Sequence, residues 1–427
     1  MVFLQLTFSP VALYQLAAIP WALLYGYLSC HGYLSITTRY MYLLVGGIVL
    51  SCVSMGVYAV LVFIQALGSM VLIYTCSWQS VHWRALAMQM AWQTGCHLWL
   101  IYKEYYMQDV NTIRLYVLVS TSMLLTQKIT SLALDIHEKK VRILPVDGGI
   151  IKGFGFQNLH EILVFISYLL CFPVLLGGPL FSFVEFYHKV SKVHVGSSSW
   201  YFWPVIKSCC FAFFLQLVKG FILGNMYPQS TLRNCRQLDC VYSMWTTALL
   251  FKLTYYSHWL LDESLCHAAG FSETYQGKEK FYDSDIWTLE TTHQISVFTR
   301  TWNKSTAKWL RRLIFEKVQF GSLLMTFSFS AWWHGLQPAH VFGFLCWGIM
   351  VKADNKIHKY FQPSQRFWYS RLIYKLFTWI QTQLIVAFLI TAIEMRSLEV
   401  VWSLCASYSC LFPLIYCFFY LLKGNKM

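Results

Sequence analysis

The stretch FGSLLMTFSFSAWWHGLQPAHVFGFLCWGIMV, residues 320–351, decides the class of fold. It contains no aspartate, glutamate, lysine or arginine over 32 residues, which is long enough to cross a bilayer. Its ionisable groups of note are two histidines, His334 and His340. A polar group in an apolar span costs free energy, so His334 is a candidate functional residue. The alternative is a hydrogen-bonded core histidine, and that interpretation is favoured for His340. Gly335 and Pro338 predict that the helix loosens just after His334.

The composition of the whole chain agrees with a membrane protein. The chain has 427 residues, of which 57% are hydrophobic and 12% charged, whereas soluble proteins carry about 25% charged residues. Its 18 tryptophans, 27 tyrosines and 32 phenylalanines are typical of lipid-facing surface and of aromatic belts at membrane interfaces. No polar linker separates the apolar runs, so we expect one integral-membrane domain over residues 1–427.

The apolar runs predict an all-α bundle of roughly ten to twelve transmembrane or re-entrant helices. Pro173, Gly177, Gly178 and Pro179 predict a broken helix within residues 162–184. The first apolar run lacks the basic start of a signal peptide, so we expect it to be a retained span. We find no internal repeat of the kind that marks many transporters. The other predicted spans lie at residues 4–30, 41–83 (two crossings), 85–102, 115–134, 200–224, 241–261, 376–393 and 400–422.

The distribution of the charged residues and cysteines bears on nucleic-acid binding, metal sites and disulfides. The net charge of +14 arises mostly in short loops, following the positive-inside rule, so we expect no nucleic-acid partner. A polar loop is expected at residues 262–290. Most of the 14 cysteines lie in apolar runs, and no Cys/His spacing predicts a metal site. Cys235 and Cys240 would pair if their loop faces an oxidising lumen.

A basic stretch precedes residues 320–351. Residues 300–317 carry six basic side chains against one acidic. One interpretation is an interfacial loop on anionic lipid; the other is a mouth that binds the phosphates of an acyl-CoA, whose apolar chain enters the membrane. Asn303 lies in this stretch, and its amide suits holding a thioester carbonyl. The sequon at Asn303 should be cytoplasmic, so we do not expect glycosylation.

The sequence WNKSTAKWL (302–310), with the histidine of AWWHG 31 residues after Asn303, resembles the signature of the membrane-bound O-acyltransferase family. LLTQKITSLALD (124–135) and LLGGPLFSF (175–183) resemble family segments as well. Longer stretches at 251–271, 285–315 and 327–351 are similar to a member that acylates a secreted peptide hormone. The resemblance weakens at 137–157, at 191–233 and in the C-terminal tail.

The resemblance implies a multi-pass enzyme of the endoplasmic reticulum membrane, with an internal tunnel and a catalytic core at residues 251–353. It would move an octanoyl group from acyl-CoA to the third-residue serine of a hormone precursor, with no other cofactor. His334 would act as general base, and Asn303 would orient the thioester or stabilise the oxyanion. Further binding residues are expected among the basic stretch and the aromatic side chains near His334: Arg300, Lys304, Lys308, Arg311, Arg312, Phe327, Phe329, Trp333 and Trp347.

Other functions remain open at this point. The same family includes enzymes that acylate lysophospholipids or other secreted proteins. A transporter would account for the glycine-broken spans and for the intramembrane lysines Lys128, Lys219 and Lys252. The lysines inside the spans at 200–224 and 241–261 (Lys207, Lys219 and Lys252) most often extend toward the interface. A non-catalytic scaffold is a third hypothesis.

Overall fold

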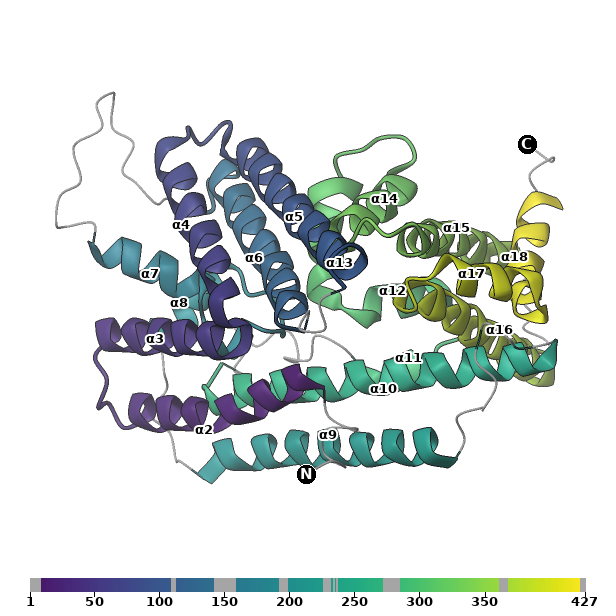
Figure 1. The fold of residues 1–427 in the computed structure, drawn as a ribbon, viewed down its shortest axis with the longest axis horizontal. Coiled ribbons are helices and arrows are strands. Elements are labelled where there is room, and N and C mark those ends of the chain that lie inside the picture. The colour runs from purple at the N-terminus through teal and green to yellow at the C-terminus, as the bar shows by residue number, and fades with distance from the viewer. Residues whose placement is uncertain are drawn as a thin grey trace. The chain divides into compact units, whose positions relative to one another are not determined.

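The structure is a computed structural model, and it describes residues 9–108, 113–141, 159–191, 199–225, 232, 235, 237–271, 285–360 and 368–422. Every regular element within these ranges is a helix (Figure 1), so the all-α prediction is confirmed. The chain packs as two compact units, each made of two segments: Met1–Phe214 with Ser257–Tyr282, and Leu215–Tyr256 with Asp283–Met427. The single-domain assignment stays a prediction.

The first unit contains the N-terminal helices. Within it α4, α5 and α6 stand side by side (Figure 1). Buried amides join them: Gln65 Nε2 donates to Gln89 Oε1 at 2.7 Å, and Gln89 Nε2 donates to Ser69 Oγ at 2.8 Å. Such side chains hold helices together where water is absent. The elements are α2 (Pro10–Cys30), α3 (Ile36–Met55), η1 (Gly56–Tyr58), α4 (Ala59–Thr75), α5 (Val81–Tyr105), α6 (Ile113–His137), α7 (Leu159–Leu169), η3 (Phe172–Val174) and α8 (Phe183–Ser191), with parts of α9 (Ser199–Asn225) and α10 (Leu238–Ala268).

The broken helix predicted at residues 162–184 is confirmed. Helix α7 ends at Leu169, a short η3 turn follows, and Gly178 takes a left-handed φ of 94° before α8 begins. The break packs tightly on α3, because a Cβ added to Gly47 would lie 1.7 Å from the carbonyl oxygen of Leu170. Lys128 Nζ donates to that same break, at 3.2 Å from the carbonyl oxygen of Leu169. Lys128 is 4% exposed, so its side chain is buried within the first unit.

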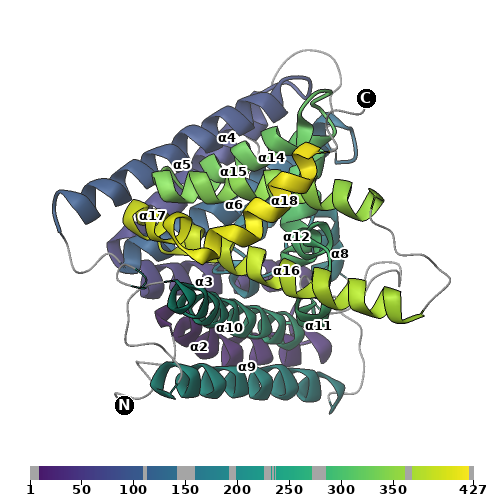
Figure 2. The ribbon, with the colours of Figure 1, turned by 90° about the vertical axis from the view of Figure 1, so that its right-hand side faces the viewer.

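The second unit contains the helices that carry the candidate site. Helix α15 runs beside α14, and α18 crosses it (Figure 2). Ala339, Ala392 and Val401 form a small buried cluster between α15, α16 and α17. The elements are α11 (Ile286–Thr291), α12 (Ile295–Trp302), α13 (Lys304–Leu310), η5 (Arg311–Phe315), α14 (Ser322–His334), α15 (Pro338–Tyr360), α16 (Trp368–Glu394), α17 (Leu398–Ala406), η6 (Tyr408–Cys410) and α18 (Leu411–Leu422), with the remaining parts of α9 and α10.

The polytopic membrane class is confirmed. Among the described residues, five helices are long and apolar enough to cross a membrane: Pro10–Cys30, Ile36–Thr75, Ile113–His137, Phe202–Asn225 and Trp368–Glu394. A sixth crossing is counted if the pair Leu398–Ala406 and Tyr408–Leu421, bent by 80°, forms one span. The segment Ile36–Thr75 has 40 residues, about twice the length that one crossing needs. The remaining elements are shorter, broken or less apolar, and the total number of crossings stays a prediction.

Two sequence expectations differ from the structure. Residues 320–351 form two helices rather than one span: α14 ends at His334, Gly335 is extended (φ 165°, ψ 164°), and α15 begins at Pro338. Proline fits the first turn of a helix because its missing N–H would have no partner there. The polar loop starts later than expected, because α10 continues to Ala268. Asp262 lies inside α10, where Gln15 Nε2 donates to it at 2.6 Å.

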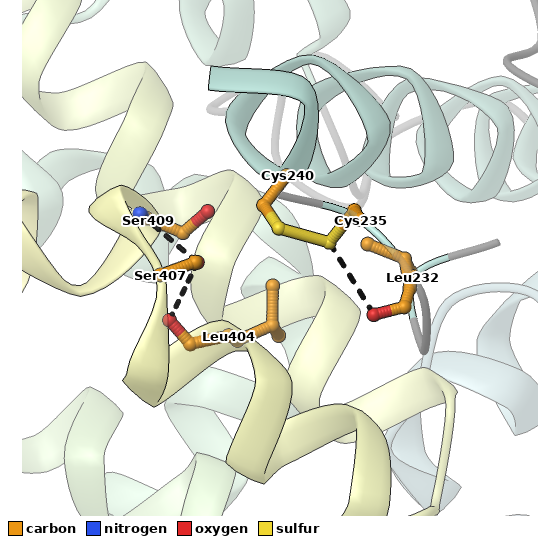
Figure 3. Close-up of a disulfide and its surroundings, with 6 residues drawn as sticks. All are labelled: Leu232, Cys235, Cys240, Leu404, Ser407 and Ser409. Carbon is orange, nitrogen blue, oxygen red and sulfur yellow. Dashed lines mark hydrogen bonds between the residues drawn. A yellow bond between two sulfur atoms is a disulfide. The ribbon is translucent and has the colours of Figure 1, made fainter. Parts of the chain in front are cut away.

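Cys235 and Cys240 form a disulfide at the start of α10. Figure 3 shows it beside the turn between α17 and α18, where Leu404, Ser407 and Ser409 lie. The pairing considered from the sequence is therefore present.

Candidate functional site

Asn303 lies at the corner between two helices. It ends α12 and begins α13, with an extended backbone (φ −152°, ψ 92°). Its side-chain oxygen Oδ1 accepts from the backbone N–H of Thr306 at 2.9 Å and from Ser305 Oγ at 3.2 Å. This is a helix N-cap. Within the described part of the chain, the amide nitrogen Nδ2 has no hydrogen-bond partner. The side-chain oxygen of Asn303 therefore caps α13, and the two N–H groups of its amide remain to bind a ligand.

His334 is the last residue of α14 and is half-buried. Its ring stacks on Phe344 with centroids 4.9 Å apart, and Trp333 meets it edge-on at 4.5 Å. His340 lies 5.9 Å from it, and His340 Nδ1 is 3.2 Å from the carbonyl oxygen of Ile393. His340 is 7% exposed, which agrees with its interpretation as a core histidine. Because the helix ends at His334, its imidazole lies at the edge of this aromatic group.

Aromatic rings connect the two predicted catalytic residues. Trp302, the neighbour of Asn303, stacks on Phe298 at 5.4 Å. Phe298 contacts Trp347 at 6.3 Å, and Trp347 stacks on Phe344 at 6.4 Å, which in turn stacks on His334. Trp347 is also fixed by its Nε1, which donates to Thr299 Oγ1 at 2.8 Å. A continuous series of ring contacts thus runs from Trp302, the chain neighbour of Asn303, to His334.

The four predicted acyl-binding aromatics fall into two groups. Phe327 lies 6.5 Å from Trp347, and a Cβ added to Gly348 would lie 3.1 Å from its ring. Phe329 and Trp333 instead contact Trp309 of α13, at 5.9 and 5.1 Å. Phe327, Trp333 and Trp347 are buried, whereas Phe329 is half-buried. The first group lies on the connection between the two candidate catalytic residues, and the second packs α14 against α13.

The predicted phosphate-binding side chains differ in exposure. Three of them (Arg300, Lys308 and Arg311) are exposed. Arg311 Nε lies 2.9 Å from Glu316 Oε1 within an exposed ion pair, and it begins a π turn. Such turns are frequent at functional sites. Lys304 and Arg312 are half-buried.

Lys304 also lies close enough to Asp285, the N-cap of α11, to affect its ionisation. The Thr288 hydroxyl, 2.7 Å from Asp285 Oδ2, makes the largest contribution to lowering the pKa of Asp285 below its ordinary value. The Thr288 backbone N–H and the Lys304 ammonium add to that effect, against a smaller contribution from burial.

Sequence reasoning missed a hydrogen-bonded network behind Trp302. Lys252 Nζ lies 2.7 Å from Glu290 Oε1 and 3.2 Å from Gln383 Oε1. Tyr256 donates to Glu290 Oε1 at 2.6 Å. Lys252 is 6% exposed, so its expected extension toward the interface was wrong. The network ties α11 to α10 and α16, and the sequence gives no signal that pairs these residues.

Two adjacent tyrosines hold the Trp302 side chain in place. Tyr255 and Tyr256 contact Trp302, with ring centroids at 5.5 and 6.2 Å. Tyr255 donates to Glu394 Oε1 at 2.6 Å, just as Tyr256 donates to Glu290. The indole next to Asn303 is therefore held by two rings, each anchored on a different carboxylate.

His258 in α10 belongs to the first unit and has a structural role there. Its Nε2 lies 2.7 Å from Ser9 Oγ and its Nδ1 lies 2.8 Å from Gln15 Oε1. These contacts support the structural role. Among the residues that the structure describes, no group of three or more His, Cys, Asp or Glu side chains is arranged to hold a metal ion.

Comparison with known proteins agrees with this arrangement. A sequence model of the membrane-bound O-acyltransferase family matches residues 85–391, which include Asn303 and His334. The chain is 47% identical to the membrane-bound ghrelin O-acyltransferase of Rattus norvegicus, over 98% of this chain and 97% of that protein. It is 49% identical to the protein of the same name from Mus musculus, over 97% of this chain and 96% of that protein. A membrane-bound glycerophospholipid O-acyltransferase 1 of Mus musculus is 25% identical over 92% of this chain and 84% of its own length. The chain therefore belongs to the membrane-bound O-acyltransferase family and is a multi-pass acyltransferase.

Proposed function

We propose that the protein transfers an octanoyl group from its coenzyme A thioester to the hydroxyl of the third residue, a serine, of the ghrelin precursor. The proposal rests on identity of 47% and 49% with two proteins named ghrelin O-acyltransferase. We further propose that the reaction takes place in the endoplasmic reticulum membrane. The Cys235–Cys240 disulfide supports a lumenal, oxidising environment at one end of the second unit.

The proposed reaction is a direct transfer. His334 takes the proton of the serine hydroxyl while the serine oxygen attacks the thioester carbonyl carbon. The negative charge that develops on the carbonyl oxygen is stabilised by the Nδ2–H groups of Asn303. The carbon–sulfur bond then breaks, and the departing thiolate receives the proton held by the imidazolium. Coenzyme A and the serine ester are the products, so atoms and charges balance without an acyl-enzyme.

The observation that carries this assignment is the dual use of Asn303. Its oxygen is fixed by two hydrogen bonds, so the orientation of the amide is set before a ligand arrives. A preoriented donor stabilises developing charge without reorganising during the reaction. The basic side chains Arg300, Lys304, Lys308, Arg311 and Arg312 are proposed to bind the phosphates of coenzyme A, and Phe327 and Trp347 the acyl chain.

The experiment uses purified protein, octanoyl-CoA and a ghrelin N-terminal peptide with the third serine intact or replaced by alanine. His334→Ala is expected to lose roughly 10²- to 10⁴-fold in kcat because the general base is removed. Asn303→Ala is expected to lose roughly 10²- to 10³-fold through the lost oxyanion donor. His31→Ala, at an exposed histidine after α2, is the matched control and should retain transfer. Full activity in either site variant, each folded, contradicts the assigned roles.

A lysophospholipid acceptor is the second candidate, because glycerophospholipid acyltransferases of Mus musculus and Homo sapiens are each 25% identical to this chain. Presenting the same protein with lysophospholipid vesicles in place of the peptide distinguishes the two. Acylation of the lipid without acylation of the peptide would replace the proposed acceptor and leave the roles of His334 and Asn303 to be tested on the lipid.

A further inference from the structure

Glu394 is a half-buried carboxylate at the end of α16. Its Oε1 accepts the hydroxyl of Tyr255 at 2.6 Å. Among the described residues, no lysine, arginine or histidine forms an ion pair with it, although the Arg396 guanidinium lies within electrostatic range. A carboxylate in an apolar surrounding is costly unless a positive group or hydrogen-bond donors compensate it. One hydroxyl therefore leaves most of its capacity to accept hydrogen bonds for another group.

Glu394 ends a helix that is hydrogen-bonded to two residues near the candidate site, Tyr255 and His340. On one side, Tyr255 connects it to Trp302 and so to Asn303. On the other, the preceding residue, Ile393, offers its carbonyl oxygen to His340 Nδ1 at 3.2 Å, and the His340 ring is 5.9 Å from His334. Hydrogen bonds thus link the end of α16 to Tyr255, which packs on Trp302, and to His340, whose ring lies near His334.

The backbone beyond Glu394 is constrained. Arg396 adopts a left-handed φ of 50°, which costs free energy for a residue other than glycine. This conformation separates the end of α16 from the start of α17 at Leu398. Strained residues of this kind concentrate at ligand-binding segments. The left-handed Arg396, two residues after Glu394, is therefore consistent with a ligand-binding turn.

The end of α16 lies at the disulfide end of the second unit. Thr391, one turn before Glu394, donates to the carbonyl oxygen of Met244 at 3.2 Å. Met244 is one helical turn after Cys240, whose disulfide lies beside the turn that follows α17 (Figure 3). Because disulfides form in oxidising compartments, this end is the one that a secretory peptide would approach.

We propose that the carboxylate of Glu394 binds the amino-terminal ammonium of the acceptor peptide. This inference rests on the proposed function, because a peptide acylated at its third residue carries its ammonium two residues from the reacting hydroxyl. Two extended residues span about 7 Å. The ammonium would form a direct ion pair with Glu394 and donate further hydrogen bonds to it. Its position would then determine which residue of the peptide reaches the reacting groups.

The test crosses one enzyme change with one peptide change. The peptide carries either a free amino terminus or an acetylated one, and the enzyme is either native or Glu394→Gln. We expect acetylation to raise the KM of the native enzyme roughly 10- to 100-fold, the range for a charged hydrogen bond. Glu394→Gln should raise the KM for the free-amine peptide by a similar factor, leave the acetylated peptide unaffected, and change kcat little.

Glu399→Gln is the matched control, since it removes an exposed acidic charge five residues further along and should leave both KM values unchanged. Equal KM changes for both peptides in Glu394→Gln would make Glu394 merely structural and overturn the proposal. Binding of the unreactive alanine-3 peptide to the native protein gives a second measurement that needs no folded variant. If acetylation does not weaken that binding, the proposal fails even though octanoyl transfer stands. If the native protein transfers no octanoyl to the free-amine peptide, the proposed function fails, and this inference fails with it.

Discussion

At the scale of single residues, Asn303 combines a structural and a chemical role within one side chain. Its Oδ1 caps α13 through the Thr306 N–H at 2.9 Å, whereas its Nδ2 faces no partner in the described residues. The alanine variant confounds these roles, because it removes the cap as well as the donor. Loss of such a cap costs about 1 kcal/mol of stability.

The substitution Asn303→Asp separates the two roles. An aspartate oxygen can still accept from Thr306, and a negative charge is favourable at a helix N-terminus. The variant should therefore unfold at or above the temperature of the native protein and yet lose octanoyl transfer at least about 100-fold, because the oxyanion donor is gone. Unfolding curves and initial rates measured on the same preparation check this. Retained activity would mean that Nδ2 is not the donor.

Phe327 provides a residue-scale test of chain-length choice. It is 9% exposed, and it packs against Trp347 at 6.5 Å and against Gly348. Phe327→Ala should create a cavity at the cost of about 3–5 kcal/mol of stability, and it should shift the preferred donor toward longer acyl chains. Competition between acyl-CoA donors of different length measures the shift. Phe329→Ala is the comparison, because Phe329 contacts Trp309 instead; an unchanged preference in Phe327→Ala would make Phe327 packing only.

At the scale of elements, the disulfide before α10 restrains a short loop. It closes a separation of five residues between Cys235 and Cys240. Loop-closure entropy gives a stabilisation of about 2 kcal/mol for a loop of this size. Cys240→Ser should lower the unfolding temperature by an amount that reductant reproduces in the native protein. Cys52→Ser, at an exposed free cysteine in α3, should change nothing, and insensitivity of the native protein to reductant would contradict the prediction.

A structural element could be predicted from the sequence where the residues that determine it are close together in the chain. Pro173 and Gly178 correctly predicted a broken helix, because proline lacks a backbone N–H donor and glycine tolerates positive φ. The spacing of Asn303 and His334 identified the family. The pairs Lys252 with Glu290 and Tyr255 with Glu394 were not predictable, since 38 and 139 residues separate their members. An uncharged run also hides the interruption of a helix, as at Gly335, because hydropathy reports how apolar a segment is and not the direction of its backbone.

At the scale of the whole molecule, stability should depend on pH through His293, which joins α11 to α12. Burial makes the largest contribution to lowering the pKa of His293 below its ordinary value of 6.5; His358 and Lys375 add to it, and Asp354 opposes it. The folded protein then binds this proton less readily than the unfolded chain does. Stability should rise as pH increases from below the lowered pKa, and this contribution should level off above about 6.5.

Unfolding temperatures between about pH 5 and pH 8 measure this effect. His293→Gln removes the titrating group, so its curve should be flatter than that of the native protein across the same window. His31→Gln provides the control at an exposed histidine. Identical pH dependence in the native protein and in His293→Gln would show that other groups determine it.

The end of α14 at His334 has an electrostatic consequence for the proposed reaction. The aligned peptide dipoles of a helix place roughly half a negative elementary charge at its C-terminal end, where the last carbonyl groups lack partners. The imidazole is therefore attached at the negative pole of a helix of 13 residues. When it accepts the serine proton, the resulting cation gains about 0.3–1 kcal/mol from that pole. A continuous helix through Gly335 would move the pole several turns away, so the interruption itself strengthens the base.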